Sequence, residues 1–253
     1  LRTRARVADQ SPRAVRRRYA RLAALYDAAV RAYEAVGLGS HREAAVAALR
    51  PAPGDHVLDL GCGTGLNLPL LVRAVGPAGQ VTGVDITPAM LARARARAAR
   101  LGWANVALAE ADLARFEPPA PIGGALATYA IDFVPEPAPL FARLAAALRP
   151  GGRVVLLGMR RPPGMPRWLA ALGALPNRPF GVTPATLERR PWEALFAVLK
   201  PVALTPLSGG AVYLAVAEAP VPPGRASAAS AAGSTLSQSH SPASRHTSRP
   251  AAS

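Results

Sequence analysis

The spacing of hydrophobic positions changes near residue 51. Before it, aromatic and aliphatic side chains recur at steps of three and four residues: Tyr19, Leu22, Tyr26, Val30 and Tyr33. This spacing places them on one face of a helix. A second, shorter helix is predicted over 41–49, because Pro51 and Pro53 end it. We therefore expect residues 1–50 to form a helical leader.

From residue 57, short apolar runs alternate with helical ones. The predicted strands are 57–60, 80–84, 106–109, 124–129, 153–158, 202–206 and 212–217. The predicted helices are 66–75, 88–101, 137–148 and 184–199. This alternation indicates an α/β fold, in which both faces of a mainly parallel sheet are covered. Only residues 207–211 join the last two strands, so the last strand is expected to be antiparallel.

One turn of this predicted sheet is rich in glycine. In "HVLDLGCGTGLNLPLL", Gly61, Gly63 and Gly65 lie between a strand and a helix. Glycine permits a positive φ and lets the backbone approach a ligand, and bare amides at a helix start favour an electronegative group. Asp85 ends the next strand, about twenty residues on, where an acidic side chain can reach ribose hydroxyls. Asp85 could instead cap the following helix, although Thr87 fits that position better. A nucleoside-bearing cofactor is predicted.

Four runs, "VLDLGCGTG", "VDITPAMLARARARA", "NVALAEADL" and "LRPGGRVVLL", resemble the class I S-adenosylmethionine (SAM) dependent methyltransferases over residues 51–219. The pattern G-x-G-x-G, in place of the G-x-G-x-x-G of dinucleotide enzymes, favours SAM over NAD. The resemblance implies a Rossmann-like sheet of seven strands, mainly parallel with an antiparallel last strand, and a domain over 51–219.

The same resemblance implies a set of cofactor-binding residues. The turn after the first strand would hold the methionine part of SAM, Asp85 the ribose, and Asp112 with the Leu113 backbone the adenine. Ile86 and Met90 either line the adenosine pocket or pack in the core between sheet and helix. The expected cofactor residues of the domain are Asp59, Gly61, Cys62, Gly63, Thr64, Gly65, Asp85, Ile86, Met90, Asp112 and Leu113.

The leader has a resemblance of its own. "YARLAALYDAAVRAYEAVGLG" looks like the Tyr-Asp leader of ubiquinone/menaquinone C-methyltransferases and bacterial phospholipid N-methyltransferases, where it caps SAM. Tyr26 is the matching position, and packing of the aromatic stripe explains it equally well. These resemblances imply methyl transfer to a small or amphipathic molecule, such as a quinone precursor, a lipid headgroup or another metabolite.

No catalytic constellation is visible in the sequence. Methyl transfer depends mainly on orientation, and a base is needed only when the acceptor carries a proton. Tyr129 and Asp132 follow the fourth strand at the ligand-binding edge, and His41 of the leader could reach the same place. For each of the three, a structural role is favoured over catalysis. No metal site is predicted, because Cys62 is the only cysteine and His240 and His246 are isolated.

The net charge is +15 and the pI about 11.5. Lys200 is the only lysine, and the many Arg, Ala and Pro residues indicate a compositional bias more than a polyanion site. An RNA methyltransferase that uses the Arg-rich residues 2–21 remains an alternative, as does a SAM-binding protein without catalysis. We rank contact with nucleic acid below a small-molecule acceptor.

Two further segments carry expectations. In "GMRRPPGMPRWLAALGALPNRPFGV", arginines beside a Trp-led apolar face suit a helix resting on anionic lipid, but a substrate-pocket wall packed onto the sheet is favoured. Residues 220–253 lack the apolar side chains of a core and are expected to be a disordered tail. No apolar run is long enough to span a membrane or form a signal peptide, and a cytoplasmic location is expected, with peripheral membrane contact as an option.

Overall fold

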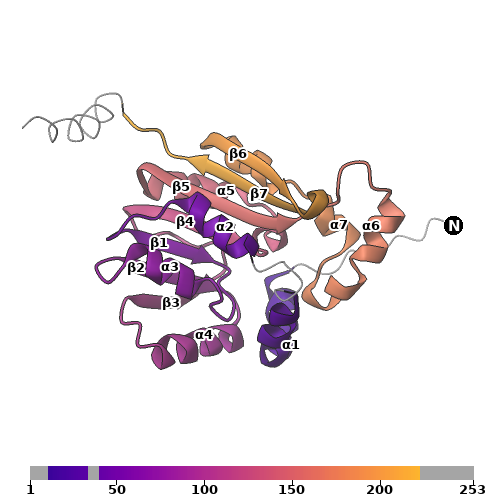
Figure 1. Cartoon of the computed structure of the whole chain (residues 1–253), viewed down its shortest axis with the longest axis horizontal. Helices are drawn as coiled ribbons and strands as arrows, with labels where there is room; N and C mark the ends of the chain where they lie inside the picture. Colours follow the sequence, from indigo (N-terminus) through magenta and orange to yellow (C-terminus); the bar gives the residue numbers. More distant parts are fainter. Residues whose placement is uncertain (1–10, 34–39, 223–253) are drawn as a thin grey trace, which may run out of the picture. The chain divides into compact units, whose positions relative to one another are not determined.

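The computed structural model describes residues 11–33 and 40–222 (Figure 1). Seven strands form one sheet in the order β3-β2-β1-β4-β5-β7-β6. Only β7 runs antiparallel to its neighbours, β5 and β6. The predicted α/β architecture with an antiparallel last strand is therefore confirmed. The strands are β1 His56–Leu60, β2 Gln80–Asp85, β3 Val106–Glu110, β4 Ile122–Thr128, β5 Leu148–Met159, β6 Lys200–Leu207 and β7 Val212–Glu218.

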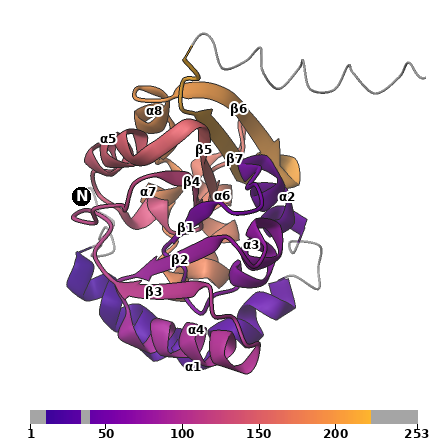
Figure 2. The same ribbon diagram turned by 90° about the vertical axis from the view of Figure 1, so that its left-hand side faces the viewer.

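Helices cover both faces of the sheet, with α2 and α3 on one face and α5 and α8 on the other (Figure 2). All residues of β4 are buried, as expected for a central strand between two helical layers. The α-helices are α1 Pro12–Tyr33, α2 Ser40–Leu49, α3 Leu68–Val75, α4 Pro88–Arg100, α5 Ala138–Ala147, α6 Arg167–Gly173, α7 Pro184–Leu187 and α8 Pro191–Phe196. The described residues also form the 3-10 helices η2 Ile131–Phe133, η3 Leu175–Phe180 and η4 Ser208–Gly210.

Several predicted boundaries differ from the structure: the helix predicted over 66–75 begins at Leu68, and the strand predicted over 153–158 extends over Leu148–Met159. Two further differences have a local cause. The helix predicted over 184–199 is divided into α7 and α8, because Pro191 keeps Arg190 out of the helical region, at φ −133°. The strand predicted over 124–129 ends at Thr128, since Tyr129 has a φ of +56°. Each of these two differences arises from the backbone conformation of one residue, Arg190 in the first and Tyr129 in the second.

Some sequence predictions concern residues that the structure does not describe. The Arg-rich residues 2–10 and the histidines His240 and His246 lie outside the described ranges. The side chains of Val30 and Tyr33, in the predicted apolar stripe, also lie outside them. Contacts along the chain separate residues 1–220 from 221–253, next to the predicted boundary after Ala219. The disorder of the tail stays a prediction.

Candidate active site

A cavity of about 330 Å³ lies where the parallel strands end. Its walls come from the glycine turn after β1, residues 85–87 after β2, residues 111–114 after β3 and residues 128–130 after β4. Because these strands are parallel, their carboxyl ends meet at one edge of the sheet, which is where ligands bind in open α/β folds. The cavity is mainly apolar, with a few polar groups, as small-molecule sites usually are.

Gly61 and Gly63 both adopt a positive φ, and Gly61 also leaves no room for a side chain. Gly61 has a φ of +69°, and a Cβ there would collide with the side chain of Ala130. Gly63 has a φ of +55°, and no described atom lies within 4 Å of the place its Cβ would take. Both residues line the cavity. The turn therefore presents bare backbone to a ligand, as the sequence predicts.

Asp85 joins the glycine turn to the end of β2. Its carboxylate accepts the N–H of Gly63 at 2.9 Å and the N–H of Thr87 at 2.8 Å. Burial raises the pKa of Asp85, and these amide bonds oppose the rise. Thr87 is the N-cap residue of α4, and its side chain makes no capping hydrogen bond. Asp85 holds the glycine turn through the Gly63 amide and also lines the cavity.

The opposite end of the cavity is formed by the segment after β3 and the start of α4. Asp112 and Leu113 line it, and Asp112 accepts the N–H of Ala114 at 3.0 Å. Ile86 and Met90 line it as well, and Met90 is also almost fully buried. Met90 therefore both lines the pocket and packs in the core.

Beneath the cavity, Asp59 of the predicted set belongs to a buried polar network whose other members the sequence analysis missed. Arg42 of α2 donates to Asn67 and to Thr128, each at 2.9 Å, and Asn67 donates to Asp59 at 2.8 Å. Asp59 is fully buried, and its Oδ2 has no hydrogen-bond partner among the described residues. Burial raises the pKa of Asp59 to about 6, opposed by the Asn67 bond. Thr128 connects this network to the cavity wall.

Three residues of the predicted cofactor set shape the turn without lining the cavity. The buried Cys62 side chain packs against Gly83 of β2, and burial raises the pKa of its thiol well above the ordinary value. Thr64 donates its hydroxyl to Asp27 of α1. Gly65 packs against Leu68 at the start of α3.

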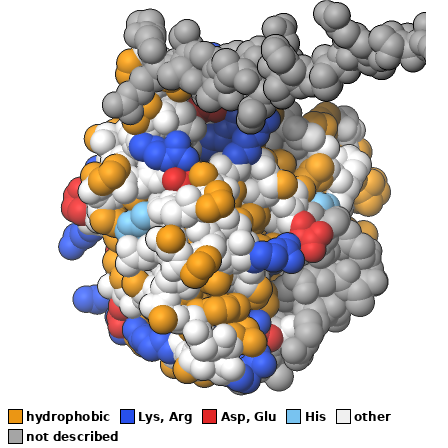
Figure 3. Space-filling view, turned by 60° about the vertical axis from the view of Figure 1, so that its left-hand side comes forward, with side chains coloured by type: hydrophobic (Ala, Val, Ile, Leu, Met, Phe, Trp, Pro, Cys, Tyr) orange, Lys and Arg blue, Asp and Glu red, His pale blue; other side chains and the backbone are white. Residues whose placement is uncertain are grey.

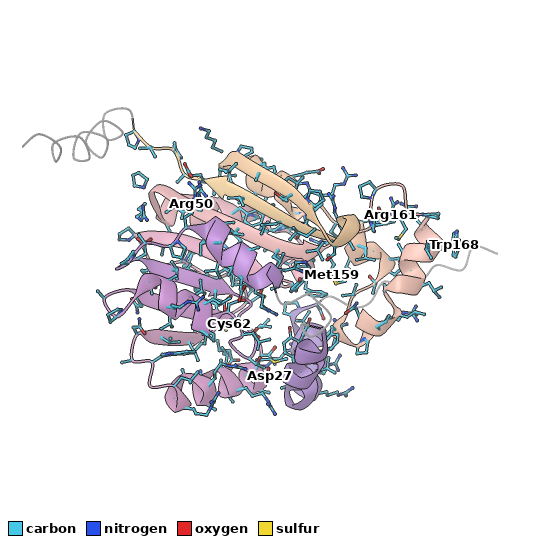
Figure 4. The ribbon with its side chains drawn as sticks, in the orientation of Figure 1. Asp27, Arg50, Cys62, Met159, Arg161 and Trp168 are labelled. Carbon is cyan, nitrogen blue, oxygen red and sulfur yellow. The ribbon has the colours of Figure 1, made fainter. Side chains whose placement is uncertain are left out.

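Helix α1 forms a further wall of the cavity. Pro12, Val15, Tyr19 and Tyr26 line it. Asp27 fixes α1 in place, because it pairs with Arg97 of α4 at 2.8 Å and accepts the Thr64 hydroxyl (Figure 4). Tyr26 of α1 is thus both a wall residue and part of an aromatic cluster with Tyr19.

Comparisons with known proteins agree with this geometry. Residues 57–152 match the family model of a methyltransferase domain. The chain is 35% identical over 157 residues to nocamycin O-methyltransferase of Saccharothrix syringae, covering 60% of this chain and 55% of that protein. It is 36% identical over 108 residues to phosphatidylethanolamine N-methyltransferase of Cereibacter sphaeroides, covering 42% and 51%. The chain thus spans about half the length of these relatives.

A solved SAM-dependent methyltransferase from Aquifex aeolicus has the same fold. It superposes with a TM-score of 0.54 at 20% identity, and the match covers 70% of this chain and 88% of that one. Residues 57–152 thus match a methyltransferase domain, and the chain has the fold of the SAM-dependent methyltransferases. The methyltransferase cavity also has suitable chemistry for SAM, with an open glycine turn, two carboxylates and an orphaned buried carboxylate oxygen beneath.

Two of the three catalytic candidates of the methyltransferase domain lie together. The hydroxyl of Tyr129, which lines the cavity, is 3.4 Å from Nδ1 of His41. Nε2 of His41 is 3.1 Å from the hydroxyl of Ser208. The guanidinium of Arg42 lies 5.7 Å from the centre of the Tyr129 ring. Tyr129 is thus held in its positive-φ conformation by contacts from α2.

The third candidate, Asp132, does not line the main cavity. It is buried and accepts the hydroxyl of Tyr213 at 3.0 Å, and burial raises its pKa to about 7. A Cβ at Gly158 would collide with both Asp132 and Tyr213. These contacts place Asp132 between η2, β5 and β7.

The segment after β5 corrects another prediction. Its Trp-led face does not pack onto the sheet, because Trp168 is 70% exposed and Leu172 is 58% exposed. The buried residues of the segment instead form a small cluster of their own: Ala170, Ala174, Val182 and Leu187. The favoured interpretation as a packed pocket wall is therefore wrong for this face.

Proposed function

We propose that the protein transfers the methyl group of SAM to a small or amphipathic molecule. The observation that carries the proposal is a single cavity, in which the glycine turn and Asp85 share walls with Tyr129 and Phe133. The lining of this cavity is mainly apolar, which suits a compact or amphipathic acceptor. Relatives named for O-methylation of nocamycin and N-methylation of phosphatidylethanolamine support this acceptor class.

The residues of the cavity suggest how SAM would be held. Asp85 lines the cavity at the end of β2, where its carboxylate would accept ribose hydroxyls, and Asp112 with the Leu113 backbone would bind the adenine. Gly61 and Gly63 offer backbone to the methionine part. Asp59 supports that end through Asn67 and Thr128.

When bound, SAM supplies an electrophilic methyl group to the acceptor. The remaining task of the chain is to exclude water and to receive a proton where the acceptor carries one. Burial lowers the pKa of His41, so its ring is neutral near pH 7, and its Nδ1 can accept the Tyr129 hydroxyl proton as the Tyr129 oxygen takes up the proton of the acceptor. The exposed Ser208 on the other ring nitrogen gives that proton a route to solvent.

The distribution of basic side chains on the surface favours a small molecule over RNA as the acceptor. On the face in Figure 3, basic side chains lie in separate groups, several beside acidic ones, with hydrophobic and uncharged atoms between them. RNA-binding proteins present a continuous basic surface or stacked aromatic residues. Arg13, Arg17 and Arg21 are exposed on α1 and could contact RNA, so the experiment below includes an RNA fraction.

The test is transfer of label from methyl-labelled SAM into a cell extract separated into metabolite, lipid and RNA fractions. We expect label in the metabolite or lipid fraction, and a large loss of transfer with Tyr129→Phe while SAM affinity stays unchanged. Label in RNA alone would reverse the ranking. SAM binding without any transfer would identify a SAM-binding protein without catalysis.

A further inference from the structure

The segment after β5 exposes a set of neighbouring apolar side chains. Trp168, Leu169, Leu172 and Leu175 are 70, 40, 58 and 44% exposed. Positions 168, 172 and 175 follow helical steps of four and three, so α6 and the start of η3 present them on one face. Figure 4 shows Trp168 at the outer end of α6, away from the sheet. We call these four residues the Trp168 face.

The opposite side of the same segment is already occupied. Ala170 and Ala174 are buried in the small cluster with Val182 and Leu187. The orientation of α6 is therefore fixed by its own packing. This packing directs the largest apolar side chains of the helix outward.

The surroundings of the Trp168 face are strongly basic. Residues 160–180, the segment that carries this face, contain four arginines and no acidic residue. The nearby Glu188 is already paired with Arg161 at 2.6 Å and lies 3.4 Å from Arg167. The side chain of Arg167 is 82% exposed beside Trp168, and Arg178 is exposed in η3.

We propose that the Trp168 face docks on the surface of an anionic membrane. Tryptophan and leucine beside arginines are the side chains that enter the interface between lipid headgroups and acyl chains. A second copy of the chain fits less well, because symmetric pairing of this face would bring the same arginines together. A nucleic acid would satisfy the arginines but leave the leucines exposed to water.

The docking face is connected to the methyltransferase cavity. The Phe180 carbonyl at the end of η3 accepts the Tyr19 hydroxyl at 3.0 Å. The Phe180 ring centre lies 5.7 Å from that of Tyr26, and both tyrosines line the cavity. Docking would thus hold the cavity near the membrane, where an amphipathic acceptor is concentrated. This last consequence rests on the proposed function, whereas docking itself does not.

Vesicle flotation tests the proposal without any knowledge of the acceptor. The full chain is mixed with vesicles of phosphatidylcholine alone or of phosphatidylcholine with phosphatidylglycerol. We expect binding to the anionic vesicles only, weakened by high salt. Trp168 fluorescence should shift to the blue on binding, since Trp192 is buried and Trp103 is partly buried.

Two separate variants, Leu172→Asp and Trp168→Ser, should each weaken vesicle binding about tenfold or more, because each removes apolar area from the interface. Val202→Asp is the matched control, since Val202 is 46% exposed on β6, and it should bind like the wild type. Equal thermal melting of all four proteins verifies that they are folded. SAM affinity should be unchanged in every one, which separates docking from the proposed function.

Three outcomes would overturn the proposal. The first is absence of wild-type binding to the anionic vesicles. The second is wild-type binding that neither Leu172→Asp nor Trp168→Ser reduces, which would place the contact elsewhere in the chain. The third is a dimer in solution that Leu172→Asp dissociates, which would show that a second copy covers the Trp168 face.

Discussion

Asp59 is a fully buried carboxyl with a raised pKa close to the candidate cofactor site. Its buried Oδ2 has no hydrogen-bond partner among the described residues, and burial raises its pKa to about 6. Without a ligand, ionising this carboxyl opposes folding, so its contribution to the free energy of unfolding falls as the pH rises from its ordinary value to about 6. A cation bound nearby would reverse this cost.

We predict that SAM affinity depends on pH through Asp59. The ammonium group of SAM should lower the pKa of Asp59, so affinity should rise with pH up to about 6 and then level off. Calorimetric titration at several pH values measures the curve. The Asp59→Asn variant should bind more weakly at pH 7 and lose most of the pH dependence. An identical curve for both proteins would show that Asp59 does not sense the cofactor.

The sequence predicted some residues of the site but not others. Gly63, Asp85 and Asp112 lie at or just after the ends of strands, so the chain order itself places them at one edge of the sheet. Arg42 lies on α2 and Asn67 immediately precedes α3, and their contact joins positions far apart in the sequence. Neither position carries a spacing signal, because their meeting depends on how α2 packs beside α3.

At the scale of elements, the contact of α1 with the glycine turn depends on Asp27. Its ion pair with Arg97 is mostly buried, with side chains 17 and 21% exposed. We predict that Asp27→Ala weakens SAM binding several-fold, because α1 loses its connection to the turn and to α4. A double-mutant cycle with Arg97→Ala should give a coupling of about 1 kcal/mol, the upper range for such pairs. Unchanged SAM affinity would mean that the leader does not close the cavity.

Element boundaries were predictable where a single pattern decided them. Proline and glycine signals located α2, α4 and the β6–β7 hairpin close to their observed positions. The segment after β5 was not predictable, since a Trp-led helix can turn its apolar face inward or outward with the same sequence. The small cluster around Ala170 and Val182 decides the orientation. That cluster depends on tertiary contacts between α6 and α7.

At the scale of the whole molecule, the sheet is completed by β7. Beyond it, the N–H of Ala219 donates to Gly152 at 2.8 Å. We predict that truncation after Ala219 leaves thermal stability and SAM affinity unchanged within about 0.5 kcal/mol, because residues 220–253 lack the side chains of a core. Melting curves and calorimetry measure both quantities. A marked fall in either would place part of the tail on the domain.

The central claim is that the cavity at the carboxyl edge of the sheet is a SAM site anchored by Asp85. Calorimetry with SAM and NAD tests it most directly, with Glu193→Ala, on the exposed face of α8, as the control. We predict binding of SAM alone, about tenfold or more weaker in Asp85→Ala and unchanged in the control, because Asp85 holds the turn and accepts the ribose hydroxyls. Binding of NAD, or SAM affinity unaffected by Asp85→Ala, would contradict the account.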